Sequence, residues 1–103
     1  MTQDTEIIGL AWYAPEHYDA IRRVMADGDN LPDTFVEWRL KATGYEEAMQ
    51  REGKTVVRVL IDPESFTDWC RAKGLNVDAK ARMLYAAFIA KLQQDSRDAA
   101  VKH

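Results

Sequence analysis

Apolar residues along this chain fall into short continuous runs and into longer stretches with helical spacing. Residues 6–13 and 55–61 are short runs in which apolar side chains occupy both alternating sets of positions. Such runs are typical of strands that are covered on both faces, as in a parallel sheet. The pattern therefore predicts two strands, each enclosed by helices.

Four helices are predicted from apolar spacing together with start and stop signals. Pro15 and Pro63 suit the first turn of a helix, because a proline there loses no hydrogen bond. Thr34 and Glu37 have the spacing of a capping box, and Gly74 suits a helix end. The expected helices cover residues 15–26, 34–51, 63–73 and 78–94, the last one capped by Asn76 or Asp78.

This order predicts a mixed α/β (α+β) fold with two short strands and four helices, arranged βααβαα. The chain of 103 residues fits one globular domain, residues 1–103, in which residues 1–5 and 95–103 are expected to be flexible. We expect one core around the strands, formed by Ile8, Leu10, Trp12, Ile21, Trp38, Val57, Val59, Ile61, Phe66, Trp69, Leu84 and Phe88.

The two strand-to-helix junctions resemble each other. Residues 12–18 and 60–66, which are 48 positions apart, both lead from an apolar run through Pro-Glu to an aromatic residue. An internal duplication explains this similarity, and so does the shared chemistry of two proline-led helix starts. Both explanations stay open.

Charge is unevenly divided between the two halves of the chain. Residues 1–52 hold eleven acids and five bases, a net charge of −6, and residues 53–103 hold six acids and nine bases, a net charge of +3. The bases of the second half are spread singly instead of forming a dense patch, so nucleic-acid binding is not favoured.

Membrane and export signals are missing from the sequence. No apolar run reaches the roughly 20 residues of a membrane-spanning helix, and residues 1–6 lack the basic start and apolar stretch of a signal peptide. The lone Cys70 cannot form an internal disulfide. These features predict a cytoplasmic protein that does not act at a membrane.

His17 and Cys70 are the first candidates for chemistry. The chain has two histidines, and one of them, His103, is its last residue. The other, His17, stands in a first helical turn, and no nucleophile that it could activate is visible in the sequence. Cys70 lies beside Trp69 on an apolar helix stripe, where a thiol is usually a small core residue. No glycine-rich phosphate loop, paired-cysteine metal site or Gly-x-Ser-x-Gly elbow is present, so we predict no cofactor, no metal and no catalytic group.

The densest acidic segment is residues 27–37, which contains Asp27, Asp29 and Asp33. Its spacing approaches a calcium loop, but Leu31, Pro32 and Trp38 stand where that motif needs an oxygen ligand, a glycine and a bidentate acid. Turn chemistry followed by a helix cap is the simpler interpretation, and a weakly bound cation or a basic partner is the alternative.

Four strings together resemble a known family. They are Trp-Tyr-x-Pro-Glu-x-Tyr at 12–18, Asp-Gly-Asp-x-Leu-Pro-Asp-Thr-Phe-x-Glu-Trp at 27–38, Val-x-Ile-Asp-Pro-Glu-x-Phe at 59–66 and Trp-Cys-x-x-x-Gly-Leu at 69–75. The chain is similar in these strings to an uncharacterised family of small bacterial proteins for which no activity is known. The resemblance implies a bacterial, cytoplasmic, single-domain protein and carries over no site.

Three functions are compatible with these observations. The first is a non-catalytic interaction or regulatory module that acts through a protein surface on an unidentified protein partner. The second is a small enzyme or ligand-binding domain whose pocket lies near Tyr13, His17 and the loop that contains Asp27, Asp29 and Asp33. The third is a nucleic-acid binder that uses the basic second half, with Arg71, Lys73, Lys80 and Arg82 as its contacts.

The last helix also predicts a homodimer. Val77, Ala81, Leu84, Tyr85, Phe88 and Leu92 supply an inward stripe. The apolar surface then extends around the helix, and a soluble monomer rarely leaves so large a patch in water. The expected dimer surface consists of Met83, Ala86, Ala87 and Ala90.

Overall fold

Two strands and four α-helices follow one another in the predicted order. The computed structural model describes the backbone of residues 6–101 and the side chains of residues 6–96. Its elements are β1 (Ile7–Trp12), η1 (Pro15–His17), α1 (Tyr18–Val24), η2 (Gly28–Asn30), α2 (Phe35–Arg51), β2 (Thr55–Leu60), α3 (Pro63–Lys73) and α4 (Ala79–Val101). The mixed α/β class and the order βααβαα are thereby confirmed.

Two helices have other boundaries than the sequence predicted. The helix expected over residues 15–26 begins as the 3-10 turn η1, and α1 ends at Val24 because Met25 is extended, with φ −80° and ψ 136°. α4 continues past Gln94 to Val101, so residues 95–101, which we expected to be flexible, are helical. The same expectation for residues 1–5, 102 and 103 lies outside the described residues.

Polar side chains cap the helices where the sequence indicated. The Glu37 amide donates to Thr34 Oγ1 at 3.1 Å, and the Thr34 amide donates to Glu37 Oε1 at 3.3 Å, which completes the capping box of α2. The Ser65 amide donates to Asp62 at the start of α3, and the Ala81 amide donates to Asp78 at the start of α4. Gly74 ends α3 with φ 70°, a left-handed conformation that glycine adopts without strain.

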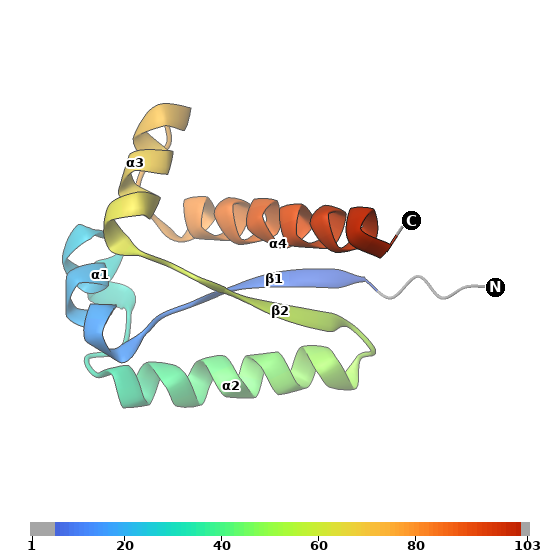
Figure 1. Ribbon diagram of the computed structural model, residues 1–103. Coiled ribbons are helices and arrows are strands. Elements are labelled where there is room, and N and C mark those ends of the chain that lie inside the picture. The colour runs from blue at the N-terminus through green and yellow to red at the C-terminus, as the bar shows by residue number, and fades with distance from the viewer. Residues whose placement is uncertain (1–5, 102–103) are drawn as a thin grey trace.

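The two strands pair in parallel and form the middle layer of the molecule. Their register runs from Ile7 opposite Thr55 to Trp12 opposite Leu60. The strands lie between α4 and α2, and α1 and α3 lie at the end where both strands terminate (Figure 1). Both sheet faces are thus covered by a long helix, as the apolar strands required.

Small residues bring α4 close to β1. A Cβ atom on Gly9 would overlap the carbonyl oxygen of Ala86, so the backbone of α4 lies directly against the strand. Ala86 and Ala90 are buried there together with Val59 of β2. Larger side chains at these positions would hold the helix farther from the sheet.

This close contact rotates α4 away from the orientation that the sequence predicted. The helix directs Arg82, Ala86 and Ala90 inward, and all three are buried. Leu84, Phe88 and Leu92, which we expected on the inward stripe, are 46%, 44% and 49% exposed. Leu84 and Phe88 therefore do not belong to the core.

The other residues of the expected core are buried or partly buried, but the buried residues form two clusters, with Val59 in the smaller one, and not the single core that we expected. Trp12, Ile21, Trp38, Val59, Ile61 and Phe66 are buried, whereas Ile8, Leu10, Val57 and Trp69 are partly buried. Trp38 is the centre of an aromatic group in which its ring lies 4.6 Å from Tyr13, 5.0 Å from Trp12 and 5.5 Å from Phe35. This group joins α2 to the carboxyl end of β1.

An ion pair fastens α2 to β2. Arg58 donates from Nε and from Nη2 to the two carboxylate oxygens of Glu46, each at 2.8 Å. Its guanidinium also lies 3.9 Å from the ring centroid of Trp12. These hydrogen bonds lower the pKa of Glu46 below its ordinary value, which keeps this buried carboxylate ionised.

The contact between Gly9 and Ala86 yields a test of the fold. Gly9→Ala should lower the free energy of unfolding by about 1–3 kcal/mol, because the new methyl group meets backbone atoms that cannot rotate away. Gly44→Ala is the matched control, since nothing lies within 4 Å of its Cβ position inside α2. That variant should gain about 0.5–1 kcal/mol. Urea denaturation measures the free energy of unfolding of both variants. Equal values for Gly9→Ala and Gly44→Ala would contradict the close packing of α4 on β1.

Candidate functional site

The outer edge of β1 carries backbone groups that no other strand of residues 6–101 pairs. The Thr55 amide donates to the Glu6 carbonyl at 2.9 Å, and the Ile61 amide donates to the Trp12 carbonyl at 2.9 Å. Because alternate residues of a strand face the same neighbour, Ile8, Leu10 and Trp12 direct their amide and carbonyl groups toward β2. The amide and carbonyl groups of the residues between them, Ile7, Gly9 and Ala11, point to the open edge.

A groove follows this edge. It consists of two adjoining hollows of about 530 and 390 Å³ that share Ile7, Gly9 and Ala87. We call the two together the edge groove. Trp38 and Tyr45 of α2 and Met83 and Ala87 of α4 line it beside β1, so it opens between the two outer layers.

Arg82, one of the residues that line the edge groove, belongs to a buried ion pair. Arg82 donates from Nη1 and Nη2 to the two oxygens of Asp27, at 2.8 and 2.9 Å. The side chains are 10% and 21% exposed, and Tyr13, which is 3% exposed, lies next to them. We call Tyr13, Asp27 and Arg82 the Arg82 cluster.

Burial and charge set the titration of this cluster. The hydrogen bonds from Arg82 hold the pKa of Asp27 below its ordinary value. Burial raises the pKa of Tyr13 to about 12, although the positive charge of Arg82 acts in the opposite direction. Near neutral pH the cluster therefore holds an ionised pair and a neutral phenol.

The other residues of the expected ligand surface lie elsewhere. His17 is partly buried, with Nδ1 lacking a hydrogen-bond partner among the described residues, and it lies near Asp62. Hydrogen bonds from Ser65 lower the pKa of Asp62, and His17 contributes less. Asp33 is exposed and lies 3.4 Å from Arg22. The structure thus brings Tyr13 and Asp27 together but does not join His17, Asp29 or Asp33 to them.

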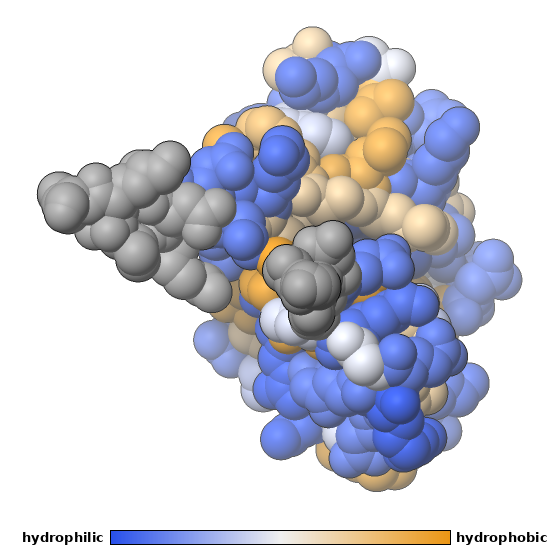
Figure 2. Space-filling model, turned by 90° about the vertical axis from the view of Figure 1, so that its right-hand side faces the viewer, coloured by the Kyte–Doolittle hydropathy of each residue, from blue (hydrophilic) through white to orange (hydrophobic). Residues whose placement is uncertain are grey.

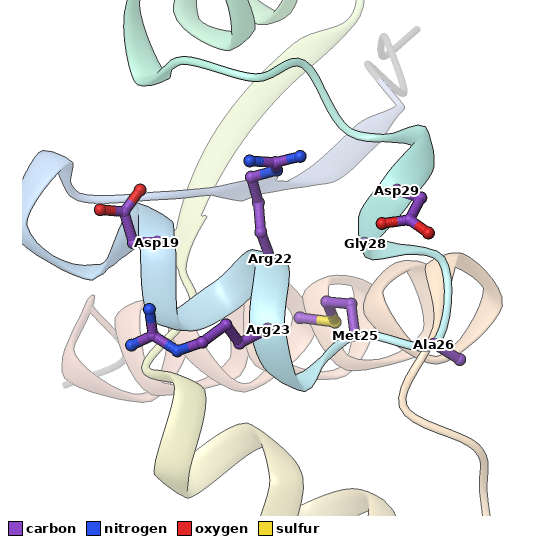
Figure 3. Close-up of a pocket in the computed structure, with 7 residues that line it drawn as sticks. All are labelled: Asp19, Arg22, Arg23, Met25, Ala26, Gly28 and Asp29. Atoms are coloured by element: carbon purple, nitrogen blue, oxygen red, sulfur yellow. The ribbon is translucent and has the colours of Figure 1, made fainter.

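Asp29 lines a separate hollow of about 440 Å³ beside α1. Figure 3 shows that Arg22 and Arg23 leave α1 in different directions and that their guanidinium groups point apart. Asp19 and Asp29 lie on opposite sides of this hollow (Figure 3). Its charged groups do not converge on a common point, so it offers no shared binding position for a ligand.

Metal and nucleic-acid chemistry find little support in the described part of the chain. No cluster of three metal-ligating side chains occurs among the described residues. The acidic segment is engaged internally, since Asp27 pairs with Arg82 and Asp33 with Arg22. Arg82, which we considered as a nucleic-acid contact, is 8% exposed and neutralised by Asp27.

The expected dimer surface is divided by the rotation of α4. Ala86 and Ala90, expected to face a second copy, are 1% and 4% exposed and packed against β1. Met83 and Ala87 are exposed and line the edge groove. A surface made of all four residues does not exist in this chain.

Sequence reasoning did not find the edge groove or the Arg82 cluster. A signal for Arg82 was present, because it stands four and eight positions before Ala86 and Ala90, on the small face of the helix. An arginine that continues a row of small buried residues needs a carboxylate partner. The carboxylate that pairs with Arg82 is set by the loop after α1, which contains Asp27. This loop is held near α4 by the Ala26 amide, which donates to the Val77 carbonyl at 2.6 Å.

Comparison with protein-family models, with curated proteins and with solved structures finds no match to this chain. The resemblance to a bacterial family stays a prediction. What the chain does has therefore to be inferred from its own geometry. Among the described residues, no helix is both long enough and apolar enough to cross a membrane.

The Arg82 cluster makes stability depend on pH. Asp27→Asn should lower the free energy of unfolding at pH 7 by about 3 kcal/mol, because Arg82 stays buried without its counter-charge. The pKa of Asp27 is lowered by folding, so its contribution is present above the unfolded pKa of about 3.9 and is lost as the pH falls through the folded pKa. The deficit of the variant should therefore shrink in urea denaturation at acidic pH.

The exposed Asp29 supplies the control for this experiment. Asp29→Asn should change the stability by less than about 0.5 kcal/mol at either pH. An Asp27→Asn deficit that stays constant from neutral to strongly acidic pH would mean that the ion pair with Arg82 is not its cause.

Cys70 gives a second test. It is 0% exposed, and burial raises the pKa of its thiol, so little reactive thiolate is available. Ellman's reagent should label Cys70 only after denaturant is added. Rapid stoichiometric labelling of the native protein would show that α3 does not hold this side chain in the core.

Proposed function

We propose that the protein is a small, non-catalytic interaction or regulatory module of the bacterial cytoplasm that acts through a protein surface. The observation that carries this proposal is the exposed side of α4. Leu84, Phe88 and Leu92 are each close to half exposed, and we call them the apolar ridge. Contiguous apolar surface of this kind is typical of sites that bind another protein.

The residues of the apolar ridge form one row along α4, and Phe88 packs against α3. The ridge residues are spaced by four positions, so they lie in one row along α4. The ring of Phe88 stacks on Trp69 of α3, with centroids 6.2 Å apart and an interplanar angle of 29°. Figure 2 shows apolar surface in the upper part of the molecule, at the level between α3 and α4 in Figure 1.

A second copy of the chain suits this surface. Two identical rows with a spacing of four interdigitate when helices cross at about −50°, the commonest class of helix packing. A two-fold axis at the crossing would place each Phe88 against the partner's ridge and bury it. The protein therefore works as a homodimer in which the two α4 helices meet, and the dimer is the form that acts on its partner.

Sedimentation equilibrium at micromolar concentration tests the dimer. The parent protein should show twice the chain mass of 11.8 kDa, and Phe88→Ser should sediment as a single chain with its helicity unchanged. Val36→Ser is the matched control, because Val36 is 66% exposed on α2, away from the ridge. A parent protein that sediments at 11.8 kDa would disprove the homodimer.

A further inference from the structure

We infer that the edge groove binds an extended segment of another polypeptide, which joins the sheet as a third strand beside β1 and has an apolar centre with acidic flanks. This surface is separate from the apolar ridge, and its role does not depend on the dimer.

The open edge supplies the main-chain contacts. Amide and carbonyl groups of Ile7, Gly9 and Ala11 point outward, as the hydrogen bonds at both ends of the ladder require. An added strand pairs with each of them, which is the usual way in which an extended peptide joins a sheet edge. β1 itself carries no charged residue that would oppose this pairing.

The two walls of the groove demand different side chains. α4 lies close to the sheet at Gly9, so residues of the segment that face Met83 and Ala87 must be small. Residues on the other face meet Trp38 and Tyr45, whose aromatic rings suit larger apolar side chains. Because side chains of a strand alternate between faces, the segment alternates small and larger apolar residues.

Three lysines stand beside the edge groove, together with the acids Glu6, which precedes Ile7 of β1, and Asp95. Lys41 is exposed on the same row of α2 as the groove residues Trp38 and Tyr45. Lys91 lines the groove, and Lys80 is exposed on the row of Met83 and Ala87. Asp95 lies 3.9 Å from Lys91, but both side chains are largely exposed and the contact is weak. Acidic residues at the ends of the segment complement these lysines and speed its association.

The β1 strand of a second copy does not fit as the occupant. Neighbouring strands lie about 4.8 Å apart, whereas packed helices need about 8–10 Å between their axes. α4 lies directly over β1, as the contact of Ala86 with Gly9 shows. Pairing β1 with a second β1 would therefore bring two α4 helices into collision, whereas a lone strand avoids this.

A synthetic peptide tests the inference. The probe is fluorescein-labelled Glu-Glu-Val-Ala-Val-Ala-Val-Glu-Glu, and the control probe has proline in place of both alanines and of the valine between them. Fluorescence anisotropy should show saturable binding of the first probe alone, because the prolines lack amide hydrogens for pairing. Failure of the first probe to bind up to millimolar concentration would overturn the inference.

Matched variants locate the binding. Ala87→Tyr fills the groove from an exposed position and should weaken binding by at least about tenfold. Ala72→Tyr places the same side chain on the exposed side of α3 and should leave the affinity unchanged. Phe88→Ser should also leave it unchanged, so loss of the dimer and loss of peptide binding are separate results. Equal affinity of Ala87→Tyr and the parent would overturn the inference.

Two further measurements examine the main-chain contacts and the charges. Bound peptide should slow hydrogen exchange at the amides of Ile7, Gly9 and Ala11 more than at those of Ile8 and Leu10, which already face β2. Replacing Lys41 and Lys91 by glutamine should weaken binding of the acidic probe but not of a glutamine-flanked probe. Equal slowing of hydrogen exchange at all five amides would exclude strand addition. A dimer that dissociates in Ala87→Tyr but not in Phe88→Ser would also overturn the inference.

Discussion

The close contact between Gly9 of β1 and Ala86 of α4 determines how the rest of the molecule is arranged. It requires small side chains where the helix meets the sheet, and Ala86 and Ala90 satisfy this requirement. Because α4 presents small residues to the sheet, three of its large residues, Leu84, Phe88 and Leu92, are turned outward. The close packing of one face of α4 and the exposure of another thus have the same cause.

Two strands do not make a complete sheet, and charged pairs compensate for the missing neighbours. Arg58 and Glu46 join β2 to α2, and Arg82 and Asp27 join α4 to the loop after α1. In both pairs one side chain is no more than 10% exposed, where removing its partner costs most. Hydrophobic contacts hold α2 and α4 against the two faces of the sheet, and each ion pair links one of these helices to a neighbouring element. The outer edge of β1 is left open between them.

The sequence was informative where local chemistry decides the structure. Thr34 with Glu37, Asp62 with Pro63, and Gly74 mark helix ends through contacts within one turn, and each lies where expected. The orientation of α4 could not be predicted in this way. Its apolar residues surround the helix, and the missing side chain of Gly9, 77 positions earlier in the chain, makes room for the backbone of Ala86 on the inward side. The partner of Arg82 was hidden for the same reason, since Asp27 is 55 positions away.

One helix therefore serves two surfaces. Met83 and Ala87 line the edge groove, while Leu84 and Phe88, the next residues along the chain, belong to the apolar ridge. Consecutive residues of an α-helix point about 100° apart, so the two surfaces share α4 without sharing a side chain. The strand that we propose for the groove and the second copy that we propose for the ridge would therefore contact different side chains of α4. Since both surfaces include residues of α4, whose close approach to the sheet depends on Gly9, a shift of this helix on the sheet would alter both surfaces together.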